Sequence, residues 1–422
     1  MTAILNCIGS LSQRQILVLV FALAFVVRLG FLATKPYAWT HKLQAGDEPL
    51  YHGLAVNLLK GQGYSFEGEP RSYPPPLYAS FVAAVYRLVG ISPPAARVGN
   101  ALLGSLLCIL VVWWSIKLWG NKAGLLTGFV AAIYYPFVQL PTYLMTENLY
   151  LPVFVAAVMI SWQLSGSLPL VNRWSQALIA GALWGLSALT REIAKPVALL
   201  VLLWLVVRKR WKEAFIMAIA IVLVGLPWSV RNRIVFNNQS QQVPSNYVPP
   251  RTPLFVQFLP GGLLYMSFGP SGNEPKILGH WNWGSDVQRP QIPKKLSPAE
   301  RDQWLRNKAW EHIKSDPMEA VIKRIPRKLA NLLTPFYGTA SLPNKVLSTL
   351  CYLALLLLSI PAIVFSWKSN NQVERTFVEL VLLTVLFTVT FHATFFGVLR
   401  YRYPIDALLL VAVGRWTQDQ KA

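Results

Sequence analysis

Two adjacent carboxylates, Asp47 and Glu48, stand at the start of a short apolar pattern in the first loop. Pro49 suits the first turn of a helix, and residues 50–58 repeat leucine at every fourth position, which predicts a helix with one apolar stripe. In one interpretation Asp47 only caps this helix. In another, a carboxylate held at the water–lipid boundary acts as a general base that takes the proton of an acceptor hydroxyl or amine. This segment alone leaves both interpretations open.

Further charged residues, which could act together with these two carboxylates, stand at the ends of other apolar segments. Glu147 lies in a Thr-Glu-Asn turn between two such segments, and four arginines border similar junctions: Arg71, Arg191, Arg400 and Arg402. A guanidinium group binds phosphate in a bidentate manner, which suits a phosphate that stays attached to a lipid. Each arginine alone is equally well explained as a membrane anchor. Together, the carboxylates and cations indicate transfer of a group from a lipid phosphate.

Polar and aromatic residues near these charges complete the candidate site. The candidate substrate contacts are Tyr51, His52, Tyr73 and Tyr401. The sequence contains no Gly-rich phosphate loop, His-Glu-x-x-His or Cys-x-x-Cys, so no cofactor is expected and a divalent metal is not indicated. The three cysteines lie at or inside apolar segments, without a disulfide or metal-binding spacing: Cys7, Cys108 and Cys351.

The composition predicts the elements that must position these residues. Of 422 residues, 54% are hydrophobic and 14% charged, and the apolar blocks are too long for globular helices, which indicates an all-α polytopic membrane protein. The net charge of +21 is assigned to loops and lipid headgroups, not to nucleic acid. About ten spans are predicted by apolar length: residues 16–34, 97–119, 123–141, 149–164, 175–190, 196–207, 211–228, 346–367, 377–396 and 404–416.

An apolar helix over residues 76–90 decides the topology, because it is short for a crossing. If it lies flat in the interface, the strongest basic cluster, residues 208–212, faces the cytoplasm, as the positive-inside rule prefers. The acids at 47, 48 and 147 and the arginine at 191 then share the outer face. The first segment, 16–34, is expected to be a retained span that enters from the cytoplasm.

Three regions follow from this pattern. Residues 1–230 form the membrane catalytic module, with the first outer loop at 35–96. Residues 231–345 form a polar extracytoplasmic subdomain, and residues 346–422 the C-terminal transmembrane helices. Within the subdomain, helices are predicted over residues 298–315 and 317–333. The second helix is expected to rest on lipid headgroups through four basic side chains: Lys323, Arg324, Arg327 and Lys328.

The order of these motifs resembles that of a known family. The matching segments are residues 47–51, 71–76, 146–147, 189–191, 210–213, 226–228 and 400–404. They resemble the GT-C superfamily of polyprenyl-phosphate-dependent glycosyltransferases, in the branch that holds protein O-mannosyltransferases and the aminoarabinose transferase of lipid A. The resemblance covers nearly the whole chain. Each motif is loose by itself, but their order and membrane side are specific.

The resemblance implies a fold and roles for single residues. It implies a GT-C-like bundle with interfacial helices in the first outer loop and a mixed extracytoplasmic subdomain. Asp47 matches the family's first-loop aspartate, the base or acceptor-orienting carboxylate, with Glu48 as its partner and Glu147 as the second-loop acid. A lysine that some members place before the first-loop proline has no counterpart, since Tyr73 and Pro74 occupy that region.

These observations predict a membrane glycosyltransferase that moves a hexose or pentose from a polyprenyl-phosphate-linked donor to a lipid, glycan or protein acceptor, with inversion. It would lie in the cell (inner) membrane with its active site on the extracytoplasmic side, where no nucleotide sugars exist. The alternative is a transporter or flippase for a lipid-linked sugar, although transporters place ionisable groups near the midplane and carry repeats. A non-catalytic scaffold is a third alternative, in which the acids are dispensable.

Overall fold

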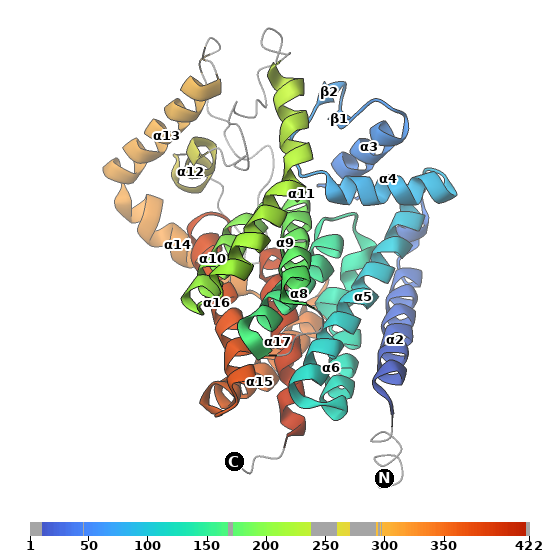
Figure 1. Ribbon diagram of the computed structural model, residues 1–422. Helices are drawn as coiled ribbons and strands as arrows, with labels where there is room; N and C mark the ends of the chain where they lie inside the picture. Colours follow the sequence, from blue (N-terminus) through green and yellow to red (C-terminus); the bar gives the residue numbers. More distant parts are fainter. Residues whose placement is uncertain are drawn as a thin grey trace. The chain divides into compact units, whose positions relative to one another are not determined.

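The structure is a computed structural model that describes residues 11–44, 46–167, 172–237, 260–270 and 298–418, with Pro293 and Leu296. The chain divides into two compact units (Figure 1). Unit 1 contains Met1–Val224, Leu350–Thr384 and Tyr403–Ala422, and unit 2 contains Gly225–Thr349 and Val385–Arg402. The described residues are helical except for loops and one hairpin, which confirms the predicted all-α fold class. Cys7 and residues 238–259 and 271–292 of the predicted subdomain lie outside the described residues.

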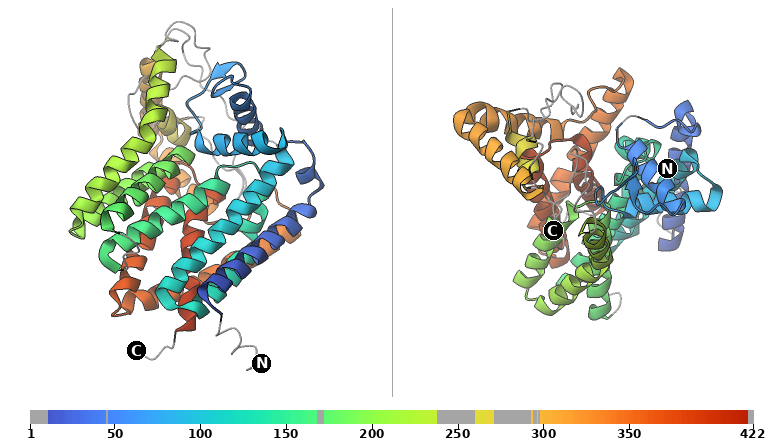
Figure 2. Two further views of the ribbon diagram at one scale, coloured as in Figure 1. Left: turned by 45° about the vertical axis from the view of Figure 1, so that its right-hand side comes forward. Right: turned by 90° about the horizontal axis from the view of Figure 1, so that it is seen from above.

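Three long helices of unit 1 lie side by side (Figure 2): α2 (Gln13–Ala33), α5 (Pro93–Trp119) and α6 (Asn121–Ile133). Local chemistry sets their ends. The side chain of Ser12 and that of Gln15 form a capping box at the start of α2. Ser92 caps α5, which ends at Gly120 with φ 84°, a conformation that favours glycine.

The predicted span at 123–141 is broken, which corrects the single straight helix expected there. Helix α6 and the following turns bend by 56° at Tyr134, whose backbone is extended and which lies two residues before Pro136. The fully buried Arg28 of α2 donates to the carbonyl oxygen of Ala132 (3.4 Å), just before the break. The Tyr134 hydroxyl donates to a buried carboxylate, Asp406 (2.9 Å).

The remaining predicted spans coincide with helices. These are α8 (Glu147–Trp162), α9 (Arg173–Thr190), α10 (Ala194–Val207), α11 (Trp211–Asn237), α15 (Leu342–Lys368), α16 (Gln372–Thr394) and α17 (Tyr403–Ala412). Among the described helices, six are long and apolar enough to cross a bilayer, or seven with the bent pair counted as one span. Three predicted spans correspond to α9, α10 and α17, which are shorter or less apolar. The polytopic membrane fold is confirmed, with fewer full-length spans than the ten predicted.

The first outer loop carries α3 (Glu48–Leu59), a hairpin and α4 (Leu77–Val89). Strands β1 (Ser65–Phe66) and β2 (Glu69–Pro70) are joined by Glu67 and Gly68, which both have positive φ, as a tight two-residue hairpin loop requires. Helix α4 has 13 residues, too few for a crossing. Figure 1 shows it lying crosswise to α2 and α5, the orientation expected of an interfacial helix.

The membrane side of this loop is a prediction that cysteine labelling checks. In a cysteine-free background, a cysteine at Lys209, between α10 and α11, should react with an impermeant thiol reagent only after the cells are permeabilised. A cysteine at the exposed Lys60, at the end of α3, should react in intact cells and serves as the control. Labelling of position 209 from outside would refute the flat placement of α4.

Unit 2 contains α12 (Pro260–Phe268), α13 (Pro298–Ser315), a π-helical turn η4 (Met318–Lys323), α14 (Arg324–Leu333) and a 3-10 turn η5 (Leu399–Arg402). The two helices predicted at 298–315 and 317–333 are therefore present. Of the four basic side chains expected on lipid headgroups, only Lys323 and Arg327 are exposed. Arg324 and Lys328 point into unit 2 and donate to backbone carbonyls, which corrects that expectation.

Candidate active site

Asp47 occupies the N-cap position of α3, but its side chain makes no capping hydrogen bond. Pro49 stands in the first turn, as predicted, and Asp47 is half-buried. The position of Asp47 therefore does not depend on capping by its carboxylate. This observation favours the interpretation in which the carboxylate has another task.

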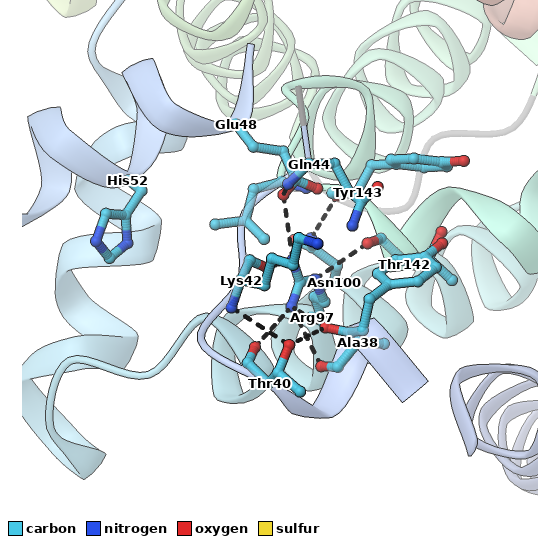
Figure 3. Close-up of polar contacts among 12 residues, drawn as sticks. Ala38, Thr40, Lys42, Gln44, Glu48, His52, Arg97, Asn100, Thr142 and Tyr143 are labelled. Carbon is cyan, nitrogen blue, oxygen red and sulfur yellow. Dashed lines mark hydrogen bonds and ion pairs between the residues drawn. The ribbon is translucent and has the colours of Figure 1, made fainter. Parts of the chain in front are cut away.

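Glu48 is fully buried and ties the first loop to the second (Figure 3). One carboxylate oxygen, Oε2, accepts from the backbone N–H of Gln44 (2.7 Å) and from the Arg97 guanidinium (3.1 Å). The other oxygen accepts from the backbone N–H of Leu144 (3.0 Å). A charge so enclosed is tolerated only when it is paired and hydrogen-bonded. These contacts hold the backbone next to Asp47 in place, and the Glu48 side chain has no exposed surface.

Arg97 is the partner that the sequence did not identify, since it appeared only as the first residue of a predicted span. It is fully buried, and besides Glu48 it holds backbone carbonyls of both loops. Those carbonyls belong to Tyr37, Ala38, Thr40, Lys42 and Thr142, at 3.1 to 3.4 Å. The sequence does contain one sign of this buried role, because Arg97 is a cation at the first position of an apolar block. Glu48 and Arg97 together fix the shape of the loop that carries Asp47.

A second set of polar and aromatic contacts ends at Tyr51. The amide of Asn100 donates to the carbonyl oxygen of Tyr143 (3.0 Å), and Tyr78 donates to the Asn100 side chain (3.3 Å). The ring of Tyr51 meets that of Tyr78 edge to face, with centroids 5.2 Å apart. Tyr51 is thus fixed at the centre of the loop.

Several predicted site residues converge on Tyr51. Burial raises the pKa of its hydroxyl well above the usual value, and the charges of Asp47 and Glu147 and the hydroxyl of Tyr73 raise it further. The charge of Arg191 acts in the opposite direction. Each of these groups lies within electrostatic reach of one hydroxyl. The structure therefore brings together residues that are up to 144 positions apart, since the set runs from residue 47 to residue 191.

Glu147 and Arg191 form an ion pair at the start of α8 and the end of α9. Thr146 links them, because its hydroxyl accepts from Arg191 (3.3 Å) and donates to Glu147 (3.1 Å). The Arg191 guanidinium also lies over the ring of Tyr150, 5.7 Å from its centroid. Glu147 is nearly fully buried and Arg191 is half-buried. In this cluster the Arg191 side chain is therefore more accessible than the Glu147 carboxylate.

The other first-loop candidates differ in exposure. Arg71 packs over the ring of Phe66 and lies 3.7 Å from the exposed carboxylate of Glu67 in the hairpin. Tyr73 is exposed, which leaves its ring accessible to a substrate. His52 is half-buried, with Nδ1 2.9 Å from the Tyr86 hydroxyl, and burial lowers its pKa. His52 therefore favours the neutral imidazole at neutral pH.

The closing Arg-Tyr-Arg-Tyr motif divides its arginines between two environments. Arg402 is buried and donates to the carbonyl oxygens of Leu332 (3.2 Å) and Thr334 (2.8 Å) in unit 2. Arg400 is half-buried, and the intervening Tyr401 stacks on His392 with centroids 4.6 Å apart. The two arginines, predicted as equivalent phosphate ligands, therefore have different surroundings.

No group of three or more His, Cys, Asp or Glu side chains is arranged to hold a metal ion within the described ranges. Cys108 is buried beside the Arg28 guanidinium, 3.4 Å away, and Cys351 is half-buried.

Comparison with known proteins gives a family match and a fold match. Residues 73–230 match the family model described as dolichyl-phosphate-mannose-protein mannosyltransferase. The fold resembles oligosaccharyltransferase AglB from Archaeoglobus fulgidus in complex with an inhibitory peptide and a dolichol-phosphate, with a TM-score of 0.55 and 13% identity. That match covers 96% of this chain and 50% of the other, so the chain spans about half the length of the oligosaccharyltransferase.

Two further structures show the same kind of likeness. The Archaeoglobus fulgidus oligosaccharyltransferase tethered with an acceptor peptide containing the NVT sequon matches at a TM-score of 0.53 and 12% identity, over 95% of this chain and 49% of that one. ArnT from Cupriavidus metallidurans bound to undecaprenyl phosphate matches at a TM-score of 0.44 and 15% identity, and the match covers 94% of this chain and 77% of that one. At these identities the structural matches show a shared fold, and the family model matches residues 73–230. Both agree with the resemblance to the GT-C superfamily that the sequence predicts.

Proposed function

We propose that this protein transfers a monosaccharide from a polyprenyl-phosphate donor to an acceptor at the extracytoplasmic face, with inversion at the anomeric carbon. The observation that carries the proposal is the ion pair of Glu147 and Arg191, bridged by Thr146, which together with Asp47 lies within electrostatic reach of the Tyr51 hydroxyl. A family model named for a dolichyl-phosphate-mannose transferase supports the donor class. The dolichol-phosphate in the related oligosaccharyltransferase structure is consistent with it.

In the proposed reaction, the acceptor's nucleophilic atom attacks the anomeric carbon from the side opposite the phosphate. Asp47 takes the proton of the nucleophile as the new bond forms. The bond between the anomeric carbon and the phosphate oxygen breaks, and its electron pair leaves with the polyprenyl phosphate. Cations stabilise the charge that develops on this leaving group. Arg71 and Arg191, which belong to the same unit as Asp47, are proposed for that task. From the sequence we also propose Arg400 as a donor-phosphate ligand, whereas the guanidinium of Arg402 is buried against carbonyls.

Transfer of label tests the function directly. Sealed membrane vesicles that contain the protein are supplied with radiolabelled polyprenyl-phosphate sugars, and the label is followed by extraction and chromatography. Label that moves from the lipid to a lipid, glycan or protein acceptor, and does not move with an Asp47→Asn variant, supports the proposal. Label that stays on the polyprenyl phosphate but changes leaflet identifies a flippase instead.

Arg400→Gln is expected to raise the donor KM, with a smaller effect on the acceptor KM. Loss of a charge-assisted hydrogen bond costs about 1.5 to 3 kcal/mol, which corresponds to a factor of about 10 to 150. Donor titrations at saturating acceptor measure the effect. Arg327→Gln is the matched control, because Arg327 is an exposed arginine of the same unit that faces Glu319. Unchanged donor kinetics in Arg400→Gln would show that Arg400 is a membrane anchor.

A further inference from the structure

Within unit 2, the segment from Thr394 to Arg402 carries Arg400 and follows the end of α16. Lys328 of α14 is fully buried and reaches the start of this segment. Its ammonium group donates to the carbonyl oxygens of Thr394 (2.8 Å) and of Ser267 near the end of α12 (2.9 Å). The C-terminal carbonyls of helices carry partial negative charge, so one cation here stabilises the ends of two helices.

The middle of the segment is held closely against α14. The side-chain amide of Asn331 donates to the carbonyl oxygen of Gly397. A Cβ at position 397 would lie only 1.9 Å from the backbone oxygen of Lys328, so the segment approaches α14 more closely than any side chain permits. Glycine is therefore required here by contact with a backbone that cannot move aside.

At the end of the segment the donor belongs to the segment itself, and the acceptors belong to α14 and the residue after it. Arg402 donates to the carbonyl oxygens of Leu332 and Thr334, at the C-terminus of α14. Three contacts thus fix the segment to α14 at its start, middle and end. Arg400 lies between the last two contacts and stays half-buried.

We propose that Lys328, Asn331 and Arg402 are positioning residues that hold residues 394–402 against α14, so that Arg400 is preorganised for the donor phosphate. This inference rests on the proposed function and deepens it. A rigid cation binds a phosphate without first losing the conformational entropy of a loose loop, and it needs no reorganisation as charge develops. Lys328, which the sequence placed on lipid headgroups, has instead an internal role at the donor site.

Substitution of Lys328 tests the proposal with two independent readouts. Lys328→Met keeps the length and apolar volume of the side chain but removes the cation. It is expected to speed hydrogen exchange of peptides from 394–402 in the intact protein. It should also raise the donor KM about tenfold, because a catalytic or binding group displaced by 1 Å can lower the rate by about 100-fold and the displacement expected here is smaller. Lys328→Arg should restore part of both effects. Lys323→Met, at an exposed lysine of the neighbouring turn, should change neither.

A double variant shows whether Lys328 acts through Arg400. In the Arg400→Gln background, Lys328→Met should add little to the donor KM, because residues that act as one unit are not additive. Full additivity would overturn the positioning role. Gly397→Ala provides a second route if Lys328→Met does not fold, because the added Cβ must push the segment off α14 while Lys328 stays in place.

The failure of this inference is distinguishable from that of the proposed function. If residues 394–402 exchange hydrogen at the normal rate in both Lys328→Met and Gly397→Ala, these contacts do not hold the segment against α14, whatever the protein's activity. Faster exchange with an unchanged donor KM in Arg400→Gln would instead overturn the assignment of Arg400 to the phosphate, and with it the functional part of this inference.

Discussion

Asp47→Asn is expected to lower turnover by about 10²- to 10⁴-fold, the range typical of a lost general base. Asparagine has the same shape as aspartate and caps helices about as well, but it accepts no proton at neutral pH. In the structure the Asp47 side chain makes no capping bond, so the substitution should leave α3 and the protein's thermal stability unchanged. Initial rates of sugar transfer and thermal unfolding in detergent measure the two properties.

The matched controls separate catalysis from loss of a surface charge. Asp47→Ala should be no more harmful to turnover than Asp47→Asn, and α3 has no side-chain cap to lose in either variant. Glu311→Gln removes an exposed acid that is no candidate site residue and should leave the rate within about twofold of the parent, as surface changes usually do. Near-normal turnover of Asp47→Asn would show that Asp47 is not the base.

Breaking the ion pair between Glu48 and Arg97 is expected to have the largest effect on stability. Removal of one partner of a buried pair costs about 3 to 5 kcal/mol, because the remaining charge is left without compensation. Arg97→Met should be the more harmful of the two substitutions, since it also orphans the carbonyls that Arg97 serves in both loops. The apparent melting temperature, followed by size-exclusion chromatography of heated samples, reports the loss.

A double-mutant cycle tests the origin of that loss. Glu48→Gln combined with Arg97→Met should be less destabilising than the sum of the single changes, because neither charge is then left buried alone. Arg173→Gln breaks a more exposed contact, 4.0 Å from Glu213, and should cost about 1 kcal/mol or less. If Glu48→Gln melts at the same temperature as Arg173→Gln, the ion pair does not fix the loop.

Local signals in the sequence predicted the elements of the first loop and of unit 2. Pro49 and the leucine repeat marked α3, and the helices at 298–315 and 317–333 were visible from their own periodicity and from Pro298 and Pro317. Such signals act within one or two turns of chain, so distant residues do not alter them. Signals that break a helix are local as well. Pro136 lies close to the bend in the segment 123–141, which the apolar pattern predicts as one helix.

The partners of charged residues were not predictable in this way. Glu48 and Arg97 are 49 residues apart, and Arg402 holds carbonyls about 70 residues away, so nothing near either residue reveals its burial. The sequence treated Arg400 and Arg402 alike because both border the same segment, whereas long-range packing separates them. The site residues around Tyr51 were predicted as one group, but the internal pairing of Glu147 with Arg191 was not.

The buried Arg28 has a consequence for the order in which the chain is assembled. An arginine inside a membrane helix opposes its insertion, by up to about 2.5 to 3.5 kcal/mol at the helix centre. Outside its own helix, Arg28 donates to the sulfur of Cys108, 80 residues later in the chain, and to the carbonyl oxygen of Ala132, 104 residues later. During synthesis α2 therefore emerges long before these partners exist. We expect α2 to stay at the insertion machinery, or near the lipid headgroups, until α5 and α6 have been made, so that α2 is synthesised before these helices but does not reach its final place before them.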